Sequence, residues 1–126
     1  MLLLDSGGVS FLAKRNQDTV AFIRALVRDG EWPPSVLSVV LAESLTGRQR
    51  EDAAVNRFLK TCDVDEELPV SLARRAGELR YRARRGSAVD ALVVASAEPG
   101  GVVLSGDVED LRALASHADR VRIERV

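Results

Sequence analysis

Four acidic residues of this chain stand in segments that are otherwise apolar. Asp5 follows the run "LLL", and Asp107 follows "VVLSG". Asp90 lies within "AVDALVVASA", and Glu43 lies within "VVLAESLT" with no Lys or Arg three or four residues away. A carboxylate on an apolar surface is costly unless a partner stabilises its charge. These four acids are therefore the first candidates for chemistry.

Carboxylates that come together repel one another and raise each other's pKa values. A hard divalent cation relieves that repulsion, and Mg²⁺ or Mn²⁺ prefers sites that are rich in carboxylate oxygens. Taken together, the four acids predict a metal site.

Three of the acids also have a purely local interpretation. Ser87 and Asp90 match a capping box at the start of a helix. Asp107 could cap the helix that follows it, with Asp110 supporting the first turn. Asp5 could be a turn residue before Ser6-Gly7-Gly8. None of these interpretations covers Glu43, and none explains why two strand ends both carry an aspartate.

The elements that must position these acids alternate between strands and helices. Strands are expected at residues 2–5, 35–37, 61–64, within 100–107 and at 121–126, the last at an edge. Helices are expected at 17–29, 39–46 (capped by Ser38), 51–60, 69–85, 88–97 and 108–117. This order predicts an α/β fold with a mostly parallel central sheet of four to five short strands flanked by helices. Ligands bind beyond the carboxyl ends of such strands, where Asp5 and Asp107 lie.

Composition limits the class of protein further. The 126 residues suit one domain, and only five are aromatic, so we expect an aliphatic core. A single cysteine excludes a disulfide framework and fits a reducing, cytoplasmic setting. No apolar run approaches the ~20 residues that span a bilayer. A net charge of -1 argues against binding nucleic acid by charge over the whole surface.

The four acidic segments, read in order, resemble a known family. "LLLDS", "VVLAESLTG", "SAVDALVVASA" and "VVLSGDVEDL" are similar to the four acidic motifs of the PIN domain in its VapC-type toxin form. The resemblance covers residues 1–126. It departs from the family at Gly7-Gly8, where a larger side chain is usual, and at Ser-Gly-Asp, where Thr-Ser-Asp is more common.

This resemblance implies a Mg²⁺-dependent ribonuclease, usually dimeric, that a cognate antitoxin protein holds inactive. It makes Asp5, Glu43, Asp90 and Asp107 the acidic quartet. Asp5, Asp90 and Asp107 are then expected as metal ligands, and Glu43 as either a ligand or the base that orients an attacking water. The resemblance further implies one peripheral acid and two supporting hydroxyls: Asp110, Ser6 and Ser105.

Two surfaces are candidates for partners. The segment 74–85 holds six arginines, expected on the solvent side of its helix, against one acid. They form either an ordinary solvated face or an RNA-binding face made by Arg80, Arg82, Arg84 and Arg85, where Tyr81 could stack on a base. A cluster of apolar residues is expected to be exposed and to bind the antitoxin, or else to complete the core or a homodimer interface: Trp32, Val40, Leu41 and Phe58.

Three other functions compete with a nuclease. A non-catalytic PIN-like module would bind RNA or a partner without cutting. A phosphoacceptor receiver domain requires a late lysine, and no lysine follows Lys60. A phosphatase of the haloacid dehalogenase type requires Asp-x-Asp after the first strand, where this chain has Asp5-Ser6-Gly7.

Overall fold

The computed structural model describes residues 1–126 as an α/β fold built on one five-stranded sheet. Neighbouring strands all run parallel, in the order β3-β2-β1-β4-β5. This confirms the predicted α/β class and the parallel sheet, with the last strand at an edge. The strands are β1 (Leu2–Leu4), β2 (Ser35–Leu37), β3 (Asp63–Asp65), β4 (Val102–Ser105) and β5 (Arg122–Arg125).

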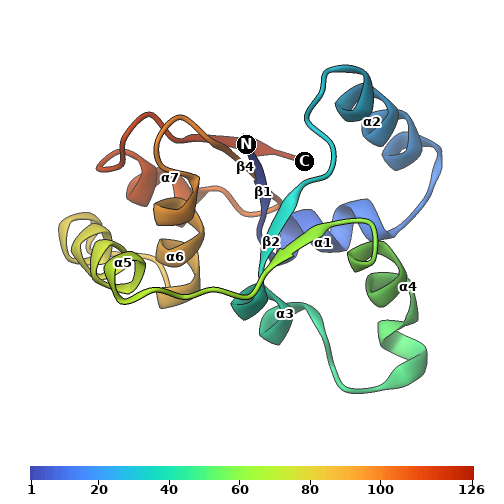
Figure 1. Ribbon diagram of the computed structural model, residues 1–126, viewed down its shortest axis with the longest axis horizontal. Helices are drawn as coiled ribbons and strands as arrows, with labels where there is room; N and C mark the ends of the chain where they lie inside the picture. Colours follow the sequence, from blue (N-terminus) through green and yellow to red (C-terminus); the bar gives the residue numbers. More distant parts are fainter.

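Seven helices cover the two faces of the sheet (Figure 1). On one side α1 (Ser6–Ala13) contacts α2 (Gln17–Arg28), α3 (Ser38–Ser44) and α4 (Gln49–Leu59). On the other side α5 (Val70–Ala83), α6 (Ala88–Ala97) and α7 (Glu109–Ala115) pack against one another. None of these helices combines the length and the apolar character that crossing a membrane requires.

The strand order reverses between β1 and β4. From β1 the chain adds β2 and β3 on one side, and it then crosses back to place β4 and β5 on the other. Ligands of open parallel sheets bind beyond the carboxyl ends of the strands at such a reversal, where the connections diverge to opposite faces. Asp5 follows β1 and Asp107 lies just beyond β4, so the topology brings both to the same end of the sheet at this reversal.

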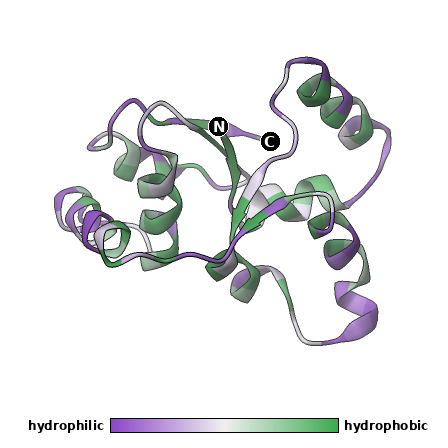
Figure 2. Cartoon of the chain, in the orientation of Figure 1, coloured by the Kyte–Doolittle hydropathy of each residue, from purple (hydrophilic) through white to green (hydrophobic).

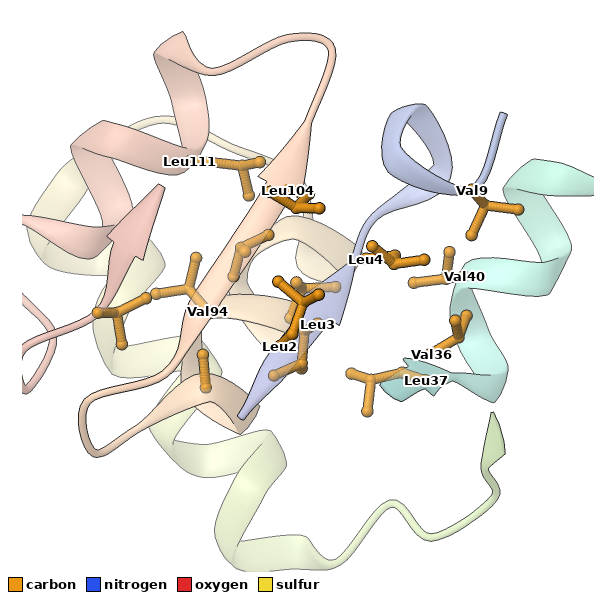
Figure 3. Packing of buried hydrophobic residues seen from close by; sticks show 14 of the residues in the cluster. Leu2, Leu3, Leu4, Val9, Val36, Leu37, Val40, Val94, Leu104 and Leu111 are labelled. Carbon is orange, nitrogen blue, oxygen red and sulfur yellow. The ribbon is translucent and has the colours of Figure 1, made fainter. Parts of the chain in front are cut away.

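Aliphatic side chains fill the space between sheet and helices, as the composition predicts. Leu3, Leu4 and Leu104 are at most 2% exposed. Figure 3 shows them between side chains from the two helical layers, and Figure 2 shows hydrophilic residues on the outer helix surfaces. Burying one such side chain stabilises the fold by roughly 1.5–3 kcal/mol. Strand β1 is therefore a firmly held base for the residue that follows it.

Two local predictions are wrong. A turn was expected after Asp5, but helix α1 begins there at Ser6. The two glycines of α1 have poor helix propensity, and packing against the sheet overrides it. Ser38 was expected to cap the next helix, but it is the first residue of α3, and the N-cap is Leu37 without a side-chain bond.

Candidate active site

Asp5 is held where strand β1 ends and helix α1 begins. Its backbone is extended, and one carboxylate oxygen, Oδ1, accepts the N–H of Gly8 at 2.8 Å. Asp5 is thus the N-cap of α1, in place of the predicted turn residue, and the cap fixes the direction of its carboxylate. The other oxygen, Oδ2, faces strand β4, where it accepts the hydroxyl of Ser105.

Ser105 links the two aspartates that follow β1 and β4. Its buried hydroxyl donates to Asp5 Oδ2 and lies 2.8 Å from the carbonyl oxygen of Asp107. The same hydroxyl accepts the N–H of Asp107 at 3.0 Å. Ser105 therefore positions the Asp5 side chain and the Asp107 backbone relative to each other.

The glycine pair after Asp5 allows α1 to approach β4 closely. A Cβ on Gly7 would lie 2.8 Å from the Gly106 nitrogen, and one on Gly8 would lie 2.6 Å from the Leu104 carbonyl oxygen. Any side chain at either position would push the start of α1 away from Ser105. The glycines that depart from the family pattern are thus required here by close packing, a role that "SGG" alone did not reveal.

Asp90 has the capping role that its sequence context allows, and it also lies close enough to affect Asp5. Its N–H donates to the Ser87 hydroxyl at 3.0 Å, and Asp90 Oδ2 accepts the Ser87 N–H at 3.2 Å. The negative charge of Asp90 contributes to raising the pKa of Asp5. The capping interpretation is therefore confirmed, and the same residue also influences the charge of Asp5.

The charge of Asp5 is poorly compensated. Burial is the largest influence and raises the pKa of the Asp5 carboxyl above its ordinary value, and the charge of Asp90 adds to the effect. The hydrogen bonds from Ser105 and Gly8 lower the pKa without cancelling the rise. No Lys or Arg forms an ion pair with Asp5. The ionised site would thus be stabilised by a bound cation.

Glu43 lies at the border of this site, in a setting that the sequence did not predict. Its side chain is exposed on α3, so the expectation of an acid placed on an apolar face is wrong. The short helix turns its apolar side, including Val40, into the core. Glu43 lines a cleft of about 320 Å³ that also includes Ser6 and Gly7, the residues directly after Asp5.

Asp107 and Asp110 differ in their surroundings. Asp107 is exposed, and its carboxylate makes no hydrogen bond or ion pair. It does not cap α7, because Val108 is the N-cap of that helix, so the capping alternative is wrong. Asp110 Oδ1 accepts Arg85 Nε at 2.7 Å, which ties α7 to the end of α5.

The donor set suits a hard divalent cation. Asp5, Asp90 and Asp107 all offer carboxylate oxygens, and the Asp5 charge lacks a cationic partner. In the arrangement of the side chains, no group of three or more His, Cys, Asp or Glu residues could hold a metal by itself. Mg²⁺ characteristically uses one or two carboxylates and completes its shell with water and substrate phosphates. These residues fit that mode of binding.

The arginines of α5 do not all face solvent, contrary to expectation. Arg75 is half-buried and donates from Nε and Nη2 to the two carboxylate oxygens of Glu98, at 2.8 and 2.7 Å. This pairing raises the pKa of Arg75 and lowers that of Glu98. Arg75 joins α5 to the end of α6 and is a structural residue.

Of the four arginines predicted to bind RNA, two form ion pairs with acidic residues and two do not. Arg82 pairs with Glu78 of its own helix, and Arg85 pairs with Asp110 and with Glu109. The remaining two, Arg80 and Arg84, have no acidic partner and both line a cleft at the carboxyl end of α5.

The apolar surface predicted to bind an antitoxin does not exist in the expected form. Val40 is 0% and Phe58 5% exposed, so both belong to the core. Trp32 and Leu41 are partly buried against that core, and Trp32 packs edge-on against Phe58. The alternative interpretation, that these residues complete the monomer core, explains their positions.

Comparisons with known proteins identify the fold. The chain matches no protein-family model, and no curated protein matches it. It is similar to a chain of the crystal structure of VapBC2 from Rickettsia felis bound to a DNA fragment from their promoter, with a TM-score of 0.70 and 13% identity. The match covers 100% of this chain and 99% of that one. At this identity the likeness establishes a shared fold.

Proposed function

We propose that this protein is a metal-dependent endoribonuclease and the toxin of a toxin–antitoxin pair. It cleaves RNA phosphodiesters with a metal-activated water, acts in the cytoplasm, works as a homodimer, and is neutralised by a cognate antitoxin protein. Its cofactor is Mg²⁺, with Mn²⁺ as a substitute.

One observation carries the nuclease proposal. At the point where the strand order reverses, Asp5 is partly buried beside Asp90, without a cationic partner, and its pKa is raised. If Asp5 were purely structural, an ion pair with a lysine or arginine, or further hydrogen-bond donors, would stabilise its charge. An acid kept in this state is typical of functional sites. Ser6 and Gly7, which directly follow Asp5, line a cleft, and the side chain of Asp107 is exposed.

The proposed roles follow from how each side chain is held. Asp5 and Asp90 are fixed by helix caps, and they and Asp107 would bind the metal either directly or through water, with substrate phosphate completing the coordination shell. Bound there, Mg²⁺ would lower the pKa of a water molecule and neutralise charge on the scissile phosphate. Ser105 holds the Asp5 carboxylate in a fixed orientation. Exposed Glu43, which lines the same cleft as Ser6, either completes the ligand set or orients the attacking water.

The toxin–antitoxin part of the proposal has separate support. The fold likeness to the VapBC2 chain extends over the whole of this chain, and the acidic motifs occur in the order typical of VapC-type toxins. A ribonuclease of this kind needs an inhibitor in the cell that makes it. Since the predicted apolar surface is part of the core, the antitoxin must bind elsewhere, and the acidic crevice would attract its basic side chains.

The direct test is cleavage of a mixed RNA pool by purified protein. We expect fragments in the presence of Mg²⁺ or Mn²⁺ and none in EDTA. The Asp5→Asn variant tests for a contaminating nuclease, because it should leave the pool intact under all conditions. RNA that is bound but never cut would instead support the non-catalytic PIN-like module.

A further inference from the structure

A second cleft lies at the carboxyl end of helix α5. It has a volume of about 480 Å³ and is separate from the cleft that Glu43 lines. Its walls come from the last two turns of α5 and from the link to α6: Gly77, Arg80, Tyr81, Arg84, Arg85 and Gly86.

The cleft carries positive charge that the protein leaves unpaired. Arg85 is neutralised by acids of α7. Arg80 donates from Nε to the Gly86 carbonyl at 3.3 Å, which orients the guanidinium without neutralising it. Arg84 ends the helix with a left-handed backbone (φ 55) and forms no hydrogen bond or ion pair through its side chain. Two guanidinium groups are thus available to an anion.

An aromatic ring stands beside these charges. Tyr81 is 78% exposed, the most exposed large hydrophobic residue of the chain, and no other aromatic ring packs on it. A solvent-exposed ring next to unpaired arginines offers stacking and phosphate binding together, the two interactions that single-stranded nucleic acid uses.

Gly77 keeps part of the cleft free of side chains. A Cβ on this residue would meet no atom within 4 Å, so packing does not explain a glycine here. Glycine within a helix is unfavourable relative to alanine. The open space above Gly77 is therefore retained at some cost to the helix.

The cleft adjoins the carboxylate site along the chain. Gly86 in its wall precedes Ser87, whose hydroxyl caps α6 at Asp90. Gly86 and Asp90 are four residues apart, so their Cα atoms are at most about 14 Å apart. An RNA strand that passes the carboxylates could therefore reach the cleft within a few nucleotides.

We propose that this cleft is a binding subsite for one unpaired nucleotide of single-stranded RNA, with the base stacked on Tyr81 and an adjacent phosphate on Arg84. The choice of RNA rests on the proposed function. A paired base in an A-form helix is not accessible to a tyrosine ring, so the subsite selects single strands.

The test is binding of a short fluorescent single-stranded RNA of mixed sequence, followed by anisotropy in EDTA so that cleavage cannot occur. Tyr81→Ala should weaken binding about tenfold. Arg84→Ala should also weaken binding, and it should reduce the slope of log affinity against log salt by about 0.7, the value for one phosphate contact on a single strand. Tyr81→Ala should leave that slope unchanged, because stacking releases no counterion.

Arg24→Ala is the matched control. Arg24 is exposed on α2, in the other helical layer, and has no acidic partner, so its loss removes the same charge from a distant place. Its affinity and salt slope should equal those of the wild type. Gly77→Ala should weaken binding and raise the thermal midpoint. Duplex RNA of the same sequence should bind equally to wild type and Tyr81→Ala.

Equal single-strand affinities for wild type, Tyr81→Ala and Arg84→Ala would overturn the subsite. If all three still cut RNA with Mg²⁺, the nuclease proposal would stand and only the subsite would fail. If binding depends on Tyr81 and Arg84 but the wild type cuts nothing, the subsite stands without the nuclease. Loss of antitoxin binding in both variants, with RNA binding unchanged, would reassign the cleft to a protein partner and contradict the proposal.

Discussion

Asp5 and Asp52 are both aspartates withdrawn from solvent near the start of a helix, yet their surroundings shift their pKa values in opposite directions. Asp52, 5% exposed, accepts the N–H and hydroxyl of Thr46, both at 2.9 Å, and the N–H of Gly47 at 2.8 Å. These donors lower its pKa. Asp5 receives two donors and has Asp90 beside it, and burial raises its pKa.

The difference separates a structural acid from a candidate for binding a cation. The carboxylate of Asp52 is saturated with donors, fixes the turn between α3 and α4, and has no remaining need for a cation. Asp5 has a charge that its surroundings only partly stabilise, at the edge of the sheet where a ligand would bind. Compensation of the charge, more than the extent of burial, distinguishes the two.

The largest expected effect is loss of catalysis in Asp5→Asn. Metal-dependent RNA cleavage should fall at least about 100-fold, because a metal contributes several kcal/mol to transition-state stabilisation. Asparagine is as good an N-cap as aspartate, so the fold should persist. Cleavage rates and thermal midpoints at neutral pH check this. A variant that is destabilised but still active would make Asp5 the structural residue of the pair.

A smaller loss of activity is expected for Ser105→Ala. Removing the hydroxyl frees the Asp5 carboxylate to turn and leaves the Asp107 N–H without its acceptor. Groups that orient a metal ligand in this way typically change affinity or activity by about 10–100-fold. The measurement is the cleavage rate as a function of Mg²⁺ concentration. Ser6→Ala, which removes a hydroxyl from the neighbouring cleft, is the comparison. A smaller loss of activity in Ser6→Ala than in Ser105→Ala would show that the bond to Asp5 matters.

Asp52→Asn should show the reverse of the Asp5 result. The amide nitrogen would face the backbone donors of the turn, so the thermal midpoint should fall by several degrees. Below that midpoint, RNA cleavage should proceed at the wild-type rate, because the Asp52 carboxylate bonds only to Thr46 and Gly47 and is used by the turn. Thermal unfolding and cleavage on one protein preparation provide both quantities. Lost activity in a protein that remains folded would contradict the assignment.

The smallest effect is a pH dependence of opposite sign for the two aspartates, measured in EDTA. The pKa of Asp5 in the folded protein is raised. Asp5 therefore leaves the stability of the fold unchanged below its ordinary pKa of 3.8, and it destabilises the fold fully above the folded pKa. Asp5→Asn should therefore gain stability relative to wild type as pH rises through this range.

Asp52 has a lowered folded pKa, so its contribution is complete above its ordinary value and is lost as pH falls through the folded pKa. The deficit of Asp52→Asn relative to wild type should therefore shrink in acid. Denaturant unfolding across pH 3–7, about the titration range of carboxyl groups, resolves the two trends. If the stability of both variants relative to wild type changed with pH in the same direction, the contrast between Asp5 and Asp52 would be wrong.

The sequence predicts the strands and most of the helices, because alternating buried runs and short connections specify a parallel sheet. It also predicts that Asp5 and the end of strand β4 lie at the same edge of that sheet. The Ser87–Asp90 capping box is likewise a local pattern, and it is present. These features depend on residues close together in the chain or on the general topology of α/β folds.

What the sequence could not reveal depends on distant contacts. Gly7 and Gly8 look like a flexible turn until the backbone of β4 is placed against them. Glu43 was expected on an apolar face, and Val40 and Phe58 at the surface, because a short helix pattern does not show which face meets the core. The sequence contains no local sign that Asp52 is buried, since its hydrogen-bond donors belong to the preceding turn.

The central claim is that the uncompensated charge at Asp5 and Asp90 binds a divalent cation, and thermal unfolding during a Mg²⁺ or Mn²⁺ titration tests it most directly. At 100 times the dissociation constant, binding to the folded state adds about 2.7 kcal/mol to stability. The midpoint of the wild type should rise with metal. Asp52→Asn should rise by the same amount from its lower starting value, and an Asp5→Asn, Asp90→Asn double variant should not respond. A wild-type midpoint indifferent to metal, or an equal rise in the double variant, would contradict the claim.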